Sequence, residues 1–256
     1  MKNPAKMDGL KYLILGAGGL GLVLRILLYT TGMDGRGLLV RGHWTATVLS
    51  VLTVAVLLVL FLATRAAAET AVYEDAYPAS ILRAVGAFAA MIGFGVTTVQ
   101  EFATFSSRLQ LMVWLLGLCS AVSMAIIGLC RLRGKKPPFL LHAAVCLYFA
   151  LRMVVCYQQW SSNPQLQDYG YYLGAFLALM LASYQHAAFD TAMGKHRALW
   201  FCSLVAVYLC CLSLKGTQDT ILLLGSGIWA FTNLTSQKPC AAVDMCGDTC
   251  PTGEEG

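Results

Sequence analysis

Two arginines that lie inside long apolar segments are the residues of this sequence best suited to binding chemistry. Arg25 lies in LVLRILLYTTG and Arg152 lies in FALRMVVCYQQW. A charge near the centre of a lipid bilayer costs at least about 2.5–3.5 kcal/mol, so such a residue faces a protein interior and finds a partner there. The planar guanidinium group matches carboxylate and phosphate groups. We therefore predict that both arginines serve either a binding site for a small anionic solute or an ion-paired clamp between helices.

The nearest candidate counter-charges flank other apolar segments on the same side of the membrane. Gln100 and Glu101 follow the third apolar segment, and Asp168 precedes the sixth. Three further side chains are placed to add hydrogen bonds: Tyr29, Gln158 and Gln159. The predicted ligand-binding residues are Arg25, Arg152, Glu101, Asp168 and Gln100.

A second candidate group lies in SYQHAAFD, where the sixth apolar segment ends. His186 and Asp190 are four residues apart and would share one face of a helix. They would suit a proton relay, or half of a metal site with His142 or His196. The alternative is an interfacial histidine beside a capping aspartate. We predict no bound metal and no cofactor.

The composition shows what must position these residues. Of 256 residues, 58% are hydrophobic and 12% are charged, against about 45–50% and 25% in soluble domains. The excess apolar surface must face lipid, so the lipid bilayer is the first expected partner. The net charge of +5 carries no basic run interleaved with aromatic residues, which argues against nucleic-acid binding.

Crossing about 30 Å of hydrocarbon takes about 20 apolar residues as a helix. Eight segments qualify or nearly qualify: 10–31, 44–64, 81–99, 109–130, 139–159, 170–189, 198–214 and 220–235. The predicted fold is therefore an all-α, polytopic helical membrane protein with about eight transmembrane helices over residues 1–236. Seven spans remain the alternative if the short eighth segment is re-entrant. Residues 237–256 carry no apolar periodicity and are predicted to form a disordered cytoplasmic tail.

The distribution of basic residues predicts the orientation. With eight spans, most lysines and arginines fall on the side of the N-terminus, and cytoplasmic loops carry such an excess. Both termini are therefore expected in the cytoplasm, with the protein in the cell membrane.

The similar contexts of the two arginines, nearly half the chain apart, indicate a parallel four-plus-four internal duplication with halves 1–131 and 132–236. Chance similarity among leucine-rich helices is the alternative reading.

The stretch LILGAGGLG imitates a dinucleotide-binding turn. Such a turn needs a preceding strand and an acidic residue about 20 positions later, whereas here an apolar run continues. Ala17 and Gly21 instead form a small-xxx-small spacing, which allows a neighbouring helix to approach closely.

The ten cysteines do not predict a disulfide framework. Seven lie within apolar segments, where cysteine behaves as a small hydrophobic residue. The spacing of Cys240, Cys246 and Cys250 does not match a structural zinc site.

Three functions follow from these observations. The first is transport or binding of a small solute at the arginines. The second is a non-transporting sensor or assembly subunit that binds another membrane protein, with the arginines as structural clamps. The third is an intramembrane enzyme, which we do not predict because the chain carries no H-E-x-x-H, G-x-S-x-G or P-loop motif.

Overall fold

The computed structural model describes residues 4–32, 43–65, 80–102, 108–160, 166–191, 193–215 and 219–235. Within its helices, the side chains of 4–8, 159–160 and 166–168 lie outside this description. Every regular element in the described ranges is a helix: α1 (Pro4–Thr31), α2 (Trp44–Arg65), α4 (Ile81–Phe102), α5 (Arg108–Leu132), α6 (Phe139–Trp160), α7 (Leu166–Asp190), α8 (His196–Ser213) and α9 (Thr220–Thr235). The all-α prediction is confirmed. The predicted tail, 237–256, lies outside the described residues.

Six of the described helices are long and apolar enough to cross a membrane: Gly9–Thr31, Trp44–Arg65, Ile81–Phe102, Arg108–Leu132, Phe139–Gln158 and His196–Ser213. The remaining two are special cases. α9 is apolar but has 16 residues, about 24 Å of helix against about 30 Å of hydrocarbon. α7 has 25 residues but carries more polar side chains than the other long helices. The chain is thus a polytopic helical membrane protein.

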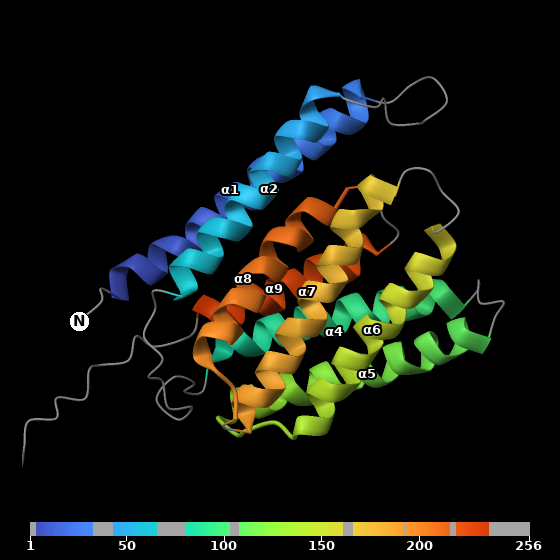
Figure 1. The fold of residues 1–256 in the computed structure, drawn as a ribbon. Coiled ribbons are helices and arrows are strands. Elements are labelled where there is room, and N and C mark those ends of the chain that lie inside the picture. The colour runs from blue at the N-terminus through green and yellow to red at the C-terminus, as the bar shows by residue number, and fades with distance from the viewer. Residues whose placement is uncertain are drawn as a thin grey trace, which may run out of the picture.

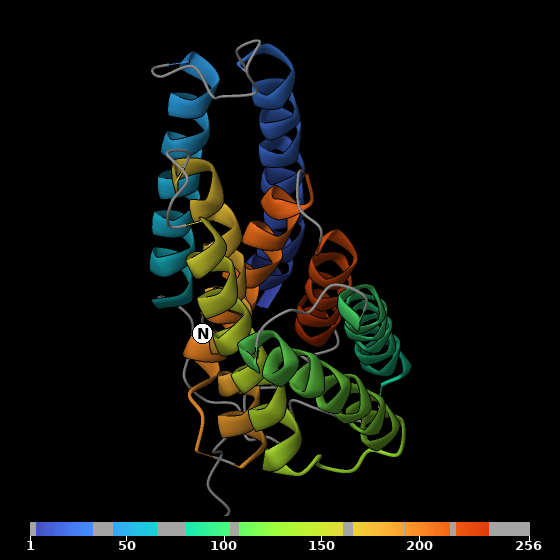
Figure 2. The same cartoon turned by 90° about the vertical axis from the view of Figure 1, so that its right-hand side faces the viewer.

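The helices form three groups (Figure 1). α1 and α2 form a hairpin that packs mainly on α8, whereas α4 and α5 form a pair whose members pack on α9 and α6. The four helices α6 to α9 are successive neighbours and lie between these two pairs, as Figure 2 shows from the side. The centre of the molecule is therefore built mainly by the second half of the chain.

Small residues bring α4 and α9 into very close contact. A Cβ atom at Gly225 of α9 would overlap the carbonyl oxygen of Ala89, and one at Gly86 of α4 would overlap Oγ1 of Thr232. A Cβ at Gly93 would lie 3.0 Å from the carbonyl oxygen of Ile221. Only glycine at these positions lets the two backbones approach this closely, which is a common device in membrane helix packing.

The glycine-rich stretch of α1 is part of one continuous helix. Gly21 faces α8, where a Cβ would lie 2.6 Å from Cδ1 of Leu212, and Gly18 faces Cys211 at 3.0 Å. A Cβ at Gly16 would meet nothing within 4 Å. The predicted close approach is confirmed at Gly21, and its partner is α8. A dinucleotide-binding turn is ruled out, because a helix occupies the place of the required strand.

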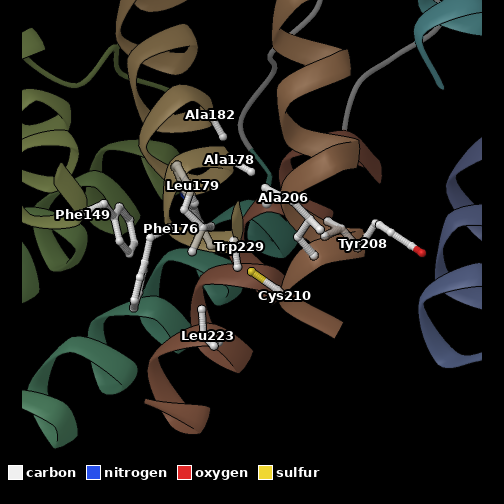
Figure 3. Packing of buried hydrophobic residues seen from close by; sticks show 14 of the residues in the cluster. Phe149, Phe176, Ala178, Leu179, Ala182, Ala206, Tyr208, Cys210, Leu223 and Trp229 are labelled. Carbon is white, nitrogen blue, oxygen red and sulfur yellow. The ribbon is translucent and has the colours of Figure 1, made fainter. Parts of the chain in front are cut away.

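The core is rich in aromatic rings. Phe94 of α4 packs edge-on against Tyr148 of α6 at 5.0 Å between centroids. Phe149 and Phe176 lie side by side in the close view of the core (Figure 3), with centroids 6.0 Å apart. α2 contributes few residues to this core, and its exposed side chains are mainly apolar, as expected of a surface in contact with lipid.

The duplication stays a prediction. If α1, α2, α4 and α5 correspond to α6, α7, α8 and α9, the extensive packing of α7 on α8 should recur between α2 and α4. Those two helices make at most marginal contact within the described residues.

Candidate functional site

One end of the bundle holds a partly buried ionic network around Arg152. Nε of Arg152 donates to Oδ2 of Asp219 at 3.2 Å, and Nη2 donates to Oδ1 at 2.7 Å. Nη1 donates to Oε1 of Glu101, and the Tyr172 hydroxyl donates to Oδ2 of Asp219. We call these four residues the Arg152 cluster. Glu101 was one of the candidate counter-charges for the two arginines, and the structure brings it to Arg152.

Four separate elements position this cluster. Glu101 lies in the last turn of α4, Arg152 lies two turns before the end of α6, and Tyr172 lies in the second turn of α7. Asp219 directly precedes α9, and its carbonyl oxygen accepts the first helical hydrogen bond, from the amide of Leu223 at 2.9 Å. All four positions fall at one end because these helices alternate in direction.

Asp219 is the principal residue that the sequence prediction missed. It stands in TQDTILLLG, immediately before the last apolar segment. Aspartate before an apolar helix is a typical N-cap residue. That signal placed Asp219 at a helix start but did not indicate which arginine it would meet.

The charge balance of the Arg152 cluster is negative. One guanidinium faces two carboxylates, so the three groups sum to −1 when both acids are ionised. The Asp219 side chain is 3% exposed, whereas those of Arg152 and Glu101 are 12% and 20% exposed, so water screens the charge of Asp219 weakly and that of Glu101 in part.

Arg25 occupies a different environment. It is 1% exposed and donates from Nη1 to the carbonyl oxygen of Leu212 at 2.7 Å. The rings of Tyr29 and Tyr171 lie 5.8 and 5.7 Å from its guanidinium carbon. A cation near the last carbonyls of α8 is stabilised by the helix dipole. Arg25 therefore links α1 to α7 and α8. On α7, Tyr171 lies beside Arg25, whereas the next residue, Tyr172, contacts Asp219 in the Arg152 cluster.

The structure does not bring the other residues predicted for this end into the Arg152 cluster among the side chains that it describes. Gln100 is exposed on α4. The side chains of Asp168 and Gln159 lie outside the described residues. Gln158 is exposed at the end of α6.

The opposite end of the bundle holds a second buried network. Nη2 of Arg131, in the last turn of α5, donates to both carboxylate oxygens of Asp190 at 2.9 Å. Nε2 of His142, in the first turn of α6, lies 3.0 Å from Oδ2 of Asp190. His186 lies one turn before Asp190 on α7. The histidine bonded to Asp190 is thus His142, rather than the predicted neighbour His186.

The two histidine rings face each other. The centroids of His142 and His186 are 6.1 Å apart, and the ring planes differ by 17°. The Trp229 ring of α9 lies 4.9 Å from that of His186. Arg83, in the first turn of α4, is buried and close enough for its charge to act on His186. We call Arg83, Arg131, His142, His186 and Asp190 the His142 cluster.

This second network corrects two expectations. The predicted orientation rests on counting basic residues on the side of the N-terminus, and Arg83 and Arg131 were included in that count. In the structure both are buried at helix ends. His196 lies elsewhere and accepts a hydrogen bond from Nε1 of Trp200 at 3.0 Å. The described residues contain no group of three His, Cys, Asp or Glu side chains arranged to hold a metal; the absence of a metal stays a prediction.

Five of the helices each carry a buried hydroxyl group without a described partner: α4, α6, α7, α8 and α9. Ten residues of α6, about 15 Å of helix, separate His142 from Arg152. Five hydroxyls find no hydrogen-bond partner among the described residues: those of Thr97, Tyr148, Ser183, Ser203 and Ser226. A buried polar group without a partner costs about 1–3 kcal/mol, so these groups suggest a use beyond packing.

Together, the fold and the two clusters define a polytopic membrane protein with an ionic network at each end of an apolar helical bundle. Compared with models of known protein families, with curated protein sequences and with solved structures, the chain shows no match.

Proposed function

We propose that the protein binds a small solute in the interior of the α4–α9 bundle and moves it across the membrane. The Arg152 cluster carries this proposal. It places one arginine and two carboxylates from three elements inside an apolar bundle, and buried ionisable groups at such depths are typical of substrate and ion pathways.

The charge balance favours a particular class of solute. The arginines alone suggested an anion, but both carboxylates of the Arg152 cluster already bind its guanidinium group. A proton or a small cation would neutralise the remaining negative charge. The proposed solute at this cluster is therefore a proton or a monovalent cation.

Reconstituted liposomes test this proposal. The flux of protons, Na⁺ and K⁺ would be followed under an imposed membrane potential. The triple variant Arg152→Met/Glu101→Gln/Asp219→Asn removes all charges of the cluster together, which limits the folding penalty of an unpaired buried charge. We expect the wild type to move at least one of these ions, and the triple variant to fold without moving it. The exposed Lys195→Ala variant is the control. Wild-type flux equal to that of empty liposomes for all three ions would contradict the proposal.

The second candidate is an assembly or sensor subunit with structural arginines. One observation favours it: Arg131 and Arg152 each bind a carboxylate from another helix or a helix start, as a clamp requires. Under this alternative the triple variant retains every measurable property except stability, and the wild type conducts none of the three ions.

A further inference from the structure

The His142 cluster fixes the position of one proton. Arg131 donates to both oxygens of Asp190, which holds this residue as a carboxylate that can only accept hydrogen bonds. Nε2 of His142, at 3.0 Å from Oδ2 of Asp190, must therefore carry the hydrogen. In the neutral ring, Nδ1 of His142 is then a lone-pair acceptor.

Two further nitrogens of the pair are buried and without a hydrogen-bond partner in the part of the chain that the structure describes. They are Nδ1 of His142 and Nε2 of His186. The two side chains are 1% and 2% exposed, so bulk water does not satisfy them. Buried polar atoms without a partner are rare and call for an explanation.

We propose that His142 and His186 form a proton-binding site that takes up one proton for the two rings. The proton adds to the lone pair of Nδ1 of His142 or to the unprotonated nitrogen of His186. No other bond forms or breaks, the site gains one positive charge, and release returns the proton to water. This proposal goes beyond the solute site at Arg152 and does not depend on it.

The limit of one proton follows from the distance between the rings. Two imidazolium ions with centroids 6.1 Å apart, inside an apolar bundle, would repel strongly, because the interior screens charge far less than water does. Such a pair titrates as a unit rather than as two independent groups.

The groups around the pair set the affinity for the proton. Burial away from water opposes uptake at His186 most strongly, Asp190 from α7 favours it, and Arg131 from α5 and Arg83 from α4 add to the opposition. α9 contributes the uncharged ring of Trp229, 4.9 Å from His186, and an aromatic face stabilises a nearby cation. Removing the charge of Arg83 must therefore strengthen proton binding.

Nuclear magnetic resonance of the full chain with ¹⁵N-labelled histidine tests this site. The chain has four histidines, so single His→Gln variants assign every imidazole signal. Between pH 4.5 and 8.5, we expect the signals of His142 and His186 to move together with one shared midpoint and with amplitudes that sum to one proton. In Arg83→Gln, the shared midpoint should move to higher pH by about one unit, a tenfold gain in affinity. In His186→Gln, His142 should take up the full proton.

The control is His196→Gln, which removes a histidine bonded to Trp200 and should leave the shared midpoint unchanged. The proposal is overturned if both rings stay neutral over this range in the wild type. Two separate full protonations, or an unchanged midpoint in a folded Arg83→Gln protein, would also overturn it. The wild-type titration alone decides the first two outcomes, whether or not a variant folds.

Discussion

Arg152 and Asp219 form a two-point ion pair across the start of α9, with Nε and Nη2 of the arginine on separate oxygens of the carboxylate at 3.2 and 2.7 Å. Charge-assisted pairs with two parallel hydrogen bonds fix the relative orientation of the two groups. Since Asp219 directly precedes α9, this pair ties the start of α9 to the middle of α6.

Breaking this pair from one side should be costly. We predict that Arg152→Ala lowers the free energy of unfolding by about 3–5 kcal/mol, because the buried Asp219 and the partly buried Glu101 lose their counter-charge. Chemical unfolding in detergent micelles, followed by circular dichroism, measures the change.

The charge-free triple variant at positions 101, 152 and 219 is the matched comparison. It should recover most of the lost stability, since replacing a whole buried ionic group by neutral residues is often nearly neutral. An Arg152→Ala protein within about 1 kcal/mol of the wild type would show that water reaches the cluster and screens it.

The α4–α9 contact should not tolerate a methyl group. We predict that Gly225→Ala lowers stability by about 1–3 kcal/mol, because its Cβ would overlap the carbonyl oxygen of Ala89. Gly19→Ala on α1 is the control, since a Cβ there meets nothing within 4 Å and alanine favours the helix. Thermal unfolding of the two variants side by side checks the difference. Equal melting temperatures would mean that α4 and α9 are less closely packed than described.

The pair of Arg131 and Asp190 should behave as one unit. We predict that Asp190→Asn destabilises the protein by about 3–5 kcal/mol, because the buried Arg131 loses its carboxylate partner. Arg131→Met in the same chain should restore most of this stability. A double-mutant cycle measures the coupling, and additive effects of the two substitutions would argue against a buried pair.

The number of crossings decides the relation of the two termini. Eight crossings place the N-terminus and the C-terminus on the same side of the membrane, whereas a re-entrant α9 places them on opposite sides. We predict the same side, the cytoplasm, because basic residues concentrate near the N-terminal side. Reporter fusions at each terminus, active on only one side of the membrane, measure this directly.

The helices could be predicted from the sequence because lipid demands long apolar segments. The eight predicted segments correspond to the eight described helices within a few residues, apart from additional turns at the ends of some. The same signal could not say which helices are neighbours. Apolar helices in lipid carry no strong directional preference, so the packing of α4 on α9 depends on glycines whose partners are distant in the sequence.

The site was predictable only in part for the same reason. The position of Arg152 inside an apolar segment indicated that it needs a polar partner, and Glu101 was among the candidates. Asp219 and Arg131 looked like ordinary residues at segment ends, and only the packing of the helices buries them. His142 and Asp190 are 48 positions apart, and no local pattern links them.

The interlocked backbones of α4 and α9 have a mechanical consequence. Close glycine contacts at three levels, two to carbonyl oxygens and one to the Thr232 side chain, oppose sliding and rotation of one helix on the other, so this pair should move as one rigid body. The α1–α2 hairpin packs mainly on α8. Fewer contacts therefore restrict its movement relative to the rest of the bundle than restrict α4 on α9. If the protein changes shape in the membrane, we expect the α1–α2 hairpin to rotate relative to α8, while α4 and α9 keep their positions relative to each other.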